Sequence, residues 1–306
     1  MPEYGVEVQL LSAAQVLPFL TGLYPECYHL VMSALASRYV KFLPLCAVAC
    51  LAIWVPAMSV LADSSRAYQD YLYQFDVYRT KYAEFKVAKN EYEKFRSLTS
   101  QTVALEKTGT MLSQRDLLLR AYLLLLGEKL NEDMGLGTAD KGIYQTLINN
   151  EVGFLDTHSK LVQSIGNLED AQEVSRGLES HYSLLQASMR QTIIGISLGK
   201  LTVLAHNFDT VLADAKALIN ANRGSLSLQK QSTIDRWLLQ ITNTKSLYQQ
   251  KIDGIVTANA QLKGNDIGEQ DQIFAKLTRN IGEARQYLVE GTGFINELVE
   301  ALRYQD

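Results

Sequence analysis

The amino-acid sequence predicts an all-α protein: an elongated antiparallel bundle of about six helices with heptad-type packing, after an N-terminal signal or anchor segment. Three observations support this fold class. All five prolines lie before residue 63, and an interior proline costs a helix about 3 kcal/mol. Apolar and aromatic residues then recur at spacings of three and four, which is typical of helices packed along a seam. Short segments with glycine and asparagine separate these runs, as expected for turns.

The first feature along the chain is an uncharged run of 21 residues, Phe42 to Ala62. Within residues 32–62 it has the order of a secretory signal peptide: basic residues, an apolar stretch, and Val60-Leu61-Ala62 at a cleavage position. The same run is long enough for an uncleaved transmembrane anchor, for which about 20 apolar residues suffice. Either form is expected to place residues 63 onward outside the cytoplasm, secreted or membrane-anchored.

Residues 1–31 do not match the usual start of an exported protein. They carry Glu3, Glu7 and Glu26 but no lysine or arginine. Two interpretations remain open. Either translation begins at Met32 and this piece is an over-extended start, or the segment is a short tail.

Composition limits the classes of function that the chain can have. At 47% hydrophobic residues it can bury a core, and its net charge of −4 is small and evenly spread. Because no basic stripe is present to neutralise phosphates, we expect no nucleic-acid partner. The cysteines, Cys27, Cys46 and Cys50, all precede residue 63, so the remainder can form neither a disulfide nor a thiolate metal site.

The first predicted helix begins at Asp63 or Ser64, both suitable N-cap residues, and continues to about Thr108. Its inward face is an aromatic seam with spacings of three and four, which predicts a partner helix along it. We interpret these rings as core residues with their hydroxyls near water. An exposed platform for a carbohydrate or a peptide is the alternative. The aromatic seam consists of Tyr68, Tyr71, Phe75, Tyr78, Tyr82, Phe85 and Tyr92.

A turn at Gly109 is expected to lead to a second helix, from Met111 to Asp133. The leucine-rich centre of this helix is too short to cross a membrane and contains an arginine, which indicates a buried core helix. After a glycine-rich turn, a third helix is expected from Thr138 to about Ile165. Its inward residues are predicted to be Ile143, Leu147, Phe154, Leu161 and Val162.

The fourth predicted helix, Leu168 to Asn222, is the longest. Gly195 and Gly199 lie inside it, and they indicate a kink or domain joint, or else the close approach of a neighbouring helix. Ser225 is expected to cap a fifth helix that ends near Lys263.

The sixth helix is predicted to begin at Asp266, which forms a capping-box pattern with Glu269. Its regular seam and the tight turn before it predict an antiparallel hairpin with the fifth helix. We expect two helical bundles, residues 63–194 and 195–306, that share the fourth helix. The main seam residues of the sixth helix are Phe274, Leu277, Ile281, Leu288, Ile295 and Leu298.

The sequence predicts no catalytic, cofactor-binding or metal-binding residue, and therefore no enzyme. Beyond residue 62 the histidines are His158, His181 and His206, and none has the glutamate three residues earlier that a di-iron bundle uses. We expect them at surface or boundary positions with satisfied hydrogen bonds. Gly135 and Gly137 follow no predicted strand, so they end a helix and do not form a phosphate-binding loop.

Three charged helical stretches follow the signal-like segment that ends in Leu61-Ala62-Asp63. They are Lys89-Asn90-Glu91-Tyr92, Ser113-Gln114-Arg115-Asp116 and Glu128-Lys129-Leu130-Asn131-Glu132. Over residues 63–165 the chain thereby resembles exported, coiled-coil-like helical proteins of the Candidate Phyla Radiation bacteria. The resemblance implies a bacterial cell-envelope setting, without an activity or site residues.

These observations favour a non-enzymatic extracytoplasmic scaffold or protein–protein interaction module of the cell envelope. Long helical seams without a polar cluster suit a spacer or a docking surface, with an envelope protein or a second copy as the partner. If the N-terminal segment is uncleaved, residues 42–62 also contact the membrane. The alternative is an extracytoplasmic ligand-binding or sensory bundle that acts through a membrane partner.

Overall fold

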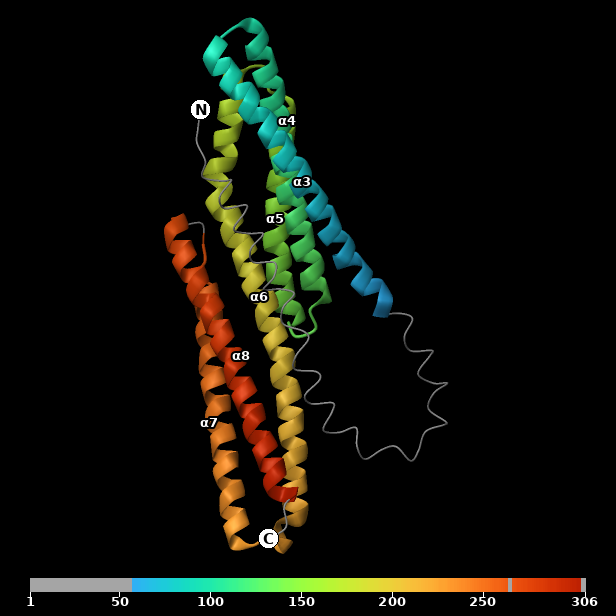
Figure 1. The fold of residues 1–306 in the computed structure, drawn as a ribbon, viewed down its shortest axis with the longest axis vertical. Coiled ribbons are helices and arrows are strands. Elements are labelled where there is room, and N and C mark those ends of the chain that lie inside the picture. The colour runs from blue at the N-terminus through green and yellow to red at the C-terminus, as the bar shows by residue number, and fades with distance from the viewer. Residues whose placement is uncertain (1–56, 264–265, 304–306) are drawn as a thin grey trace. The chain divides into compact units, whose positions relative to one another are not determined.

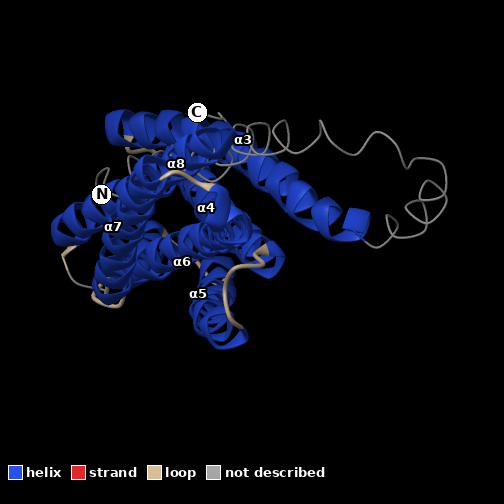
Figure 2. Cartoon of the chain, turned by 90° about the horizontal axis from the view of Figure 1, so that it is seen from below, coloured by secondary structure: helices blue, strands red, loops and turns tan. Residues whose placement is uncertain are grey.

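A computed structural model describes residues 57–263 and 266–303, and this part of the chain is all-α, as the sequence predicts (Figure 1). Figure 2 shows helices joined by short loops and no strand among the described residues. The segment 1–31 and most of the predicted signal or anchor, 32–62, lie outside them. The helices are α3 (Ala57–Phe95), α4 (Leu98–Glu132), α5 (Thr138–Gln163), α6 (Leu168–Asn222), the 3-10 helix η2 (Arg223–Ser225), α7 (Leu228–Asn259) and α8 (Ile267–Arg303).

The chain divides into two compact units. Unit 1 takes the described residues up to Glu128 together with Val152–Tyr182. Unit 2 takes Lys129–Glu151 and the described residues from Ser183 onward. Helices α4, α5 and α6 therefore each supply residues to both units, and the predicted domain boundary after residue 194 stays a prediction.

Helix α3 begins at Ala57, earlier than the predicted start at Asp63. Ser64, the other predicted cap, is a buried residue inside the helix. The bond after Ala62, where the sequence predicts cleavage, also lies within α3.

The first helical hairpin turns at Arg96 and Ser97, so the predicted turn at Gly109 is wrong. Arg96 has a φ of 47°, and the hydroxyls of Ser97 and Ser100 each accept a hydrogen bond from the other residue's backbone N–H, at 3.2 and 3.1 Å. This reciprocal capping starts α4. Gly109 lies inside α4, because a single interior glycine weakens a helix by only about 1 kcal/mol. The change of spacing after Tyr92 is the sequence signal for the true turn.

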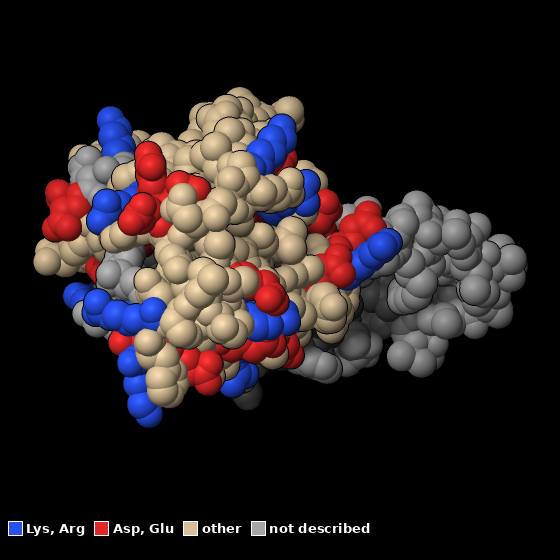
Figure 3. All heavy atoms as spheres, turned by 90° about the horizontal axis from the view of Figure 1, so that it is seen from above, with Lys and Arg blue, Asp and Glu red and all other residues tan. Residues whose placement is uncertain are grey.

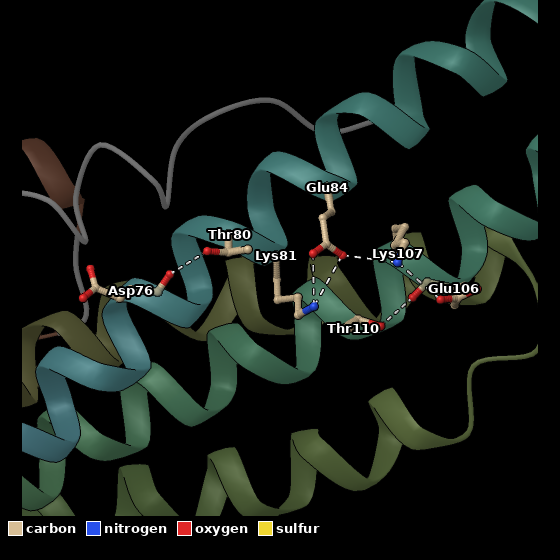
Figure 4. Close-up of polar contacts among 7 residues, drawn as sticks. All are labelled: Asp76, Thr80, Lys81, Glu84, Glu106, Lys107 and Thr110. Atoms are coloured by element: carbon tan, nitrogen blue, oxygen red, sulfur yellow. Dashed lines mark hydrogen bonds and ion pairs between the residues drawn. The ribbon is translucent and has the colours of Figure 1, made fainter.

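Helices α3 and α4 lie antiparallel in unit 1. Glu84 on α3 is ion-paired with Lys107 on α4, at 3.2 Å, and also with Lys81 on its own helix (Figure 4). Further from the turn, the rings of Tyr71 and Tyr122 are 5.4 Å apart. The residues that contact each other therefore lie further from the turn on both helices, as expected for an antiparallel hairpin.

Helix α4 is the centre of unit 1. Three consecutive residues, Gln114, Arg115 and Asp116, are all buried, so neighbouring helices cover α4 on several sides. Its buried apolar residues in unit 1 are Ala104, Met111, Leu112, Leu118, Leu119, Tyr122, Leu123, Leu125 and Leu126.

Unit 2 is built around the C-terminal part of α6 with α7 and α8. The predicted hairpin of α7 and α8 is present, with Lys251 paired to Glu283 and the rings of Trp237 and Phe294 5.7 Å apart. Helix α7 also contacts α6, because the hydroxyl of Tyr248 donates a hydrogen bond to the backbone carbonyl of Leu201, at 3.3 Å. Burial of facing apolar residues on the three helices forms the core of this unit.

Helix α7 is capped by Ser227, and the prediction that Ser225 caps it is wrong. The Ser227 hydroxyl accepts a hydrogen bond from the backbone N–H of Lys230, at 3.3 Å. Ser225 ends the preceding 3-10 turn, so the chain needs two more residues to enter α7.

Gly195 and Gly199 lie in an uninterrupted α6, where they allow close packing within unit 2. A Cβ on Gly195 would collide with the ring of Tyr144, and one on Gly199 would collide with the carboxylate of Asp133. Of the two predicted roles, close approach of a neighbour is the one for which the structure gives a contact. Alanine at either position would force these groups apart.

Candidate docking groove

One face of α4 in unit 1 remains open to solvent. Leu117 and Leu124, seven residues apart on this face, are 46% and 43% exposed. Ala121 lies between them and is half-buried. Residues at these spacings share one side of a helix, so they form a short apolar line within residues 111–128, which are otherwise buried or half-buried.

A groove with a volume of about 490 Å³ runs along this face, between α4 and the first part of α3. From each helix, the lining residues have spacings that place them on one face. Apolar side chains line it centrally, and charged side chains lie along both helices. The lining residues are Asp63, Arg66, Ala67, Asp70 and Gln74 of α3, and Leu117, Arg120, Ala121, Leu124 and Glu128 of α4.

The inner end of the groove is held by a hydrogen bond between the two helices. The side-chain amide of Gln114 donates to the side-chain oxygen of Gln74, at 2.6 Å, and to the Gln74 backbone carbonyl, at 3.3 Å. One turn of α3 away, Tyr71 is buried against Tyr122. Burial raises the pKa of Tyr71 to about 12, with a smaller contribution from Tyr68. These contacts fix the distance between the two walls.

The charges of the groove are unevenly compensated. Arg120 donates a hydrogen bond from Nε to Asp156 on α5, at 3.0 Å, so its charge is already paired. Asp63, Asp70 and Glu128 have no ion pair among the described residues. Their carboxylates therefore give the unpaired part of the groove an acidic character, which Arg66 alone opposes.

A buried polar cluster lies on the covered side of α4. His158 of α5 is 3% exposed; its Nδ1 lies 2.7 Å from Oδ2 of Asp116 and its Nε2 lies 2.9 Å from the carbonyl oxygen of Val174. Both ring nitrogens face acceptors, so both donate only when the imidazole is protonated. Burial disfavours that charge, but the bonds to Asp116 and Val174 outweigh it and raise the pKa of His158 above its ordinary value. The predicted surface or boundary position of His158 is wrong, although its hydrogen bonds are satisfied.

Arg115 adds a second buried charge to this cluster. Burial lowers the pKa of its guanidinium, against the opposing effect of the Asp116 carboxylate. Nε and Nη2 of Arg115 and Oδ1 of Asp116 have no hydrogen-bond partner within the described structure. The bonds of His158 to Asp116 and to Val174 connect α5 with α4 and α6 in unit 1, which is a structural role.

The predicted seam residues are buried or half-buried. On α3, Tyr71 and Tyr78 are buried, and the half-buried members are Tyr68, Phe75, Tyr82, Phe85 and Tyr92. On α8, Phe274 is half-buried, and the buried members are Leu277, Ile281, Leu288, Ile295 and Leu298. Two residues predicted inward on α5 are instead exposed, Ile143 at 61% and Leu161 at 51%. They lie beside the buried stripe of α5, where the sequence pattern is too wide to exclude them.

Sequence reasoning misses the groove itself. Leu117 and Leu124 belong to a leucine-rich helix for which the sequence indicates a broad buried face. Their seven-residue spacing does not separate them from the core, because the buried pairs Leu118 and Leu125, and Leu119 and Leu126, share it.

On the face seen in Figure 3, basic and acidic side chains are interspersed. Among the described residues, no three His, Cys, Asp or Glu side chains gather as a metal site would need. Across residues 57–263 and 266–303, each helix is too short or too polar to span a bilayer. Comparisons with protein-family models, with characterised proteins and with solved structures give no match.

Proposed function

We propose that this chain is a non-enzymatic docking module of a cell envelope, held outside the cytoplasm, whose unit 1 receives a helix of a protein partner. The groove between α3 and α4 is the docking site. The expected signal or anchor segment and the likeness to exported helical proteins support the location.

The observation that carries the proposal is the open apolar face of α4. Leu117, Ala121 and Leu124 form a line that solvent reaches, although the other residues of α4 from Met111 to Glu128 are buried or half-buried. Exposed apolar surface rimmed by charged residues is typical of interaction sites. Eleven residue steps from Leu117 to Glu128 extend about 16 Å, so the groove matches about three turns of a bound helix.

The buried rings of α3 favour this proposal over the ligand-binding alternative. A carbohydrate or peptide platform needs exposed aromatic faces, whereas Tyr71 and Tyr78 are 5% and 6% exposed. These rings are suited to hold α3 against α4. They thereby support the groove wall.

Site-specific photo-cross-linking in the producing cells tests the proposal. A photoreactive amino acid at Leu124 is expected to give a defined protein adduct, which disappears when Ala121→Trp fills the groove. The matched control is Leu161, a leucine of unit 1 with similar exposure that does not line the groove. Absence of an adduct at Leu124, or the same adducts at both positions, would contradict a docking site here.

A further inference from the structure

We infer that the occupant of the groove is a basic amphipathic helix, with a stripe of leucine or alanine flanked by lysine or arginine. This inference rests on the proposed docking function and names the chemistry of the partner. It follows from the charges, the register and the floor of the groove.

The charges of the groove favour a cationic partner. Arg120 is neutralised by Asp156, which leaves three unpaired carboxylates and the single guanidinium of Arg66 among the lining residues. A partner with Lys or Arg flanks gains attraction on approach and once bound. A surface rich in phosphate, such as a nucleic acid or an anionic membrane, would instead be repelled.

The register of the hairpin places the acidic residues along the groove. Glu84 is ion-paired with Lys107, and Asp63 and Glu128, each an equal number of residues further from the turn, both line the groove. At the end remote from the turn, Asp63 and Arg66 of α3 and Glu128 of α4 line the groove, so carboxylates are in excess there. Asp70 lies two helical turns from Asp63 on the same wall, so basic residues seven apart on the bound helix can face both carboxylates.

The floor of the groove selects for a close-packed helix. Ala67 and Ala121 are small, so a partner backbone can approach, while Leu117 and Leu124 offer apolar contact. A second copy of this chain is a poorer occupant, because it would bring an equally acidic rim against the first.

Two synthetic peptides of about four helical turns test the inference. They share one leucine and alanine stripe, and they differ in carrying Lys or Glu at the flanks. Binding to the full chain is measured by fluorescence anisotropy. We expect the Lys peptide to bind at least tenfold more tightly than the Glu peptide at low salt, with the difference shrinking as salt rises.

Charge reversal in the groove supplies the specific control. The double variant Asp70→Lys, Glu128→Lys is expected to reduce Lys-peptide affinity at least tenfold, and Asp70→Asn, Glu128→Gln is expected to reduce it less. Glu173→Lys changes an exposed acid of unit 1 outside the groove and should leave affinity unchanged. Thermal unfolding of each variant checks that the fold is retained.

Several results would overturn the inference. They are equal affinity for the two peptides, preference for the Glu peptide, no saturable binding, or equal effects of the groove variant and Glu173→Lys. A dimer in sedimentation experiments that Ala121→Trp disrupts would assign the groove to a second copy instead. None of the peptide results removes the docking function itself, which fails only if cross-linking at Leu124 gives no specific adduct.

Discussion

At the scale of single residues, the pair of His158 and Asp116 links the stability of unit 1 to pH. Its geometry favours the imidazolium, and the pKa of His158 is raised in the folded state. A raised folded pKa means that the native chain binds the proton more tightly than the unfolded chain. The resulting stabilisation is fully present below the unfolded pKa of about 6.5 and is lost as pH rises through the folded pKa.

The variant His158→Gln tests this linkage. At about pH 6 it should destabilise the protein by about 3 kcal/mol, because it leaves the buried Asp116 carboxylate without its charged partner. The difference from wild type should become smaller at about pH 9, because the stabilisation is lost as pH rises through the folded pKa of His158. Urea unfolding at both pH values measures it, and an equal difference at both would contradict an imidazolium at this position.

The aromatic seam yields a second prediction at this scale. Tyr71→Phe should change the free energy of unfolding little, because the ring supplies most of the buried area, and Tyr71→Ala should lower it by about 3 to 5 kcal/mol. Tyr82→Ala should cost less, since Tyr82 is only half-buried. Thermal unfolding measures all three. Wild-type stability of Tyr71→Ala would defeat the core role and favour a binding platform.

At the scale of elements, the position of the first turn decides how the substitution of Gly109 changes stability. Gly109 lies inside α4, and a Cβ there would meet nothing within 4 Å. Gly109→Ala should therefore stabilise the protein by about 1 kcal/mol. If Gly109 lay in a turn with a positive φ, alanine would destabilise the protein. A destabilised Gly109→Ala variant would therefore indicate that the turn lies at Gly109.

The hairpin of α7 and α8 gives an element-scale prediction in unit 2. Leu277→Asp and Leu288→Asp should each bury an unpaired charge and lower stability by about 3 kcal/mol or more. The matched control is Val289→Asp, next to Leu288 in sequence but 45% exposed, which should change stability by less than about 1 kcal/mol. Equal thermal stability of the three variants would refute the packing of α8 through these seam residues.

At the scale of the whole molecule, the location of the chain is the prediction that matters most. The test is a reporter that is active only outside the cytoplasm, fused after residue 306. We expect this reporter to be active, whether or not the segment 32–62 is cleaved. N-terminal sequencing then separates the two forms, with Asp63 expected first in a cleaved chain. Activity of a cytoplasmic reporter at the same position would overturn the proposed envelope setting.

Periodicity explains which parts of the fold could be predicted. The seam of α8, with Leu277, Ile281 and Leu288, repeats along one helix and needs no knowledge of its neighbours. Turn chemistry is less decisive, because Ser97 and Ser100 compete with Gly109 as signals and the energies differ by only about 1 kcal/mol. The sequence therefore predicts the seam correctly, whereas it predicts the turn at the wrong residue.

The amino-acid sequence by itself determined the all-α class, the hairpin of α7 and α8 and the seam residues, since these follow from proline placement and spacing within each helix. Only the tertiary structure decided that Leu117 and Leu124 stay open and that His158 lies buried beside Asp116. The physical reason is that burial of a helix face depends on how many neighbours surround it. Partners such as Asp116 and His158 meet only when helices distant in sequence pack together.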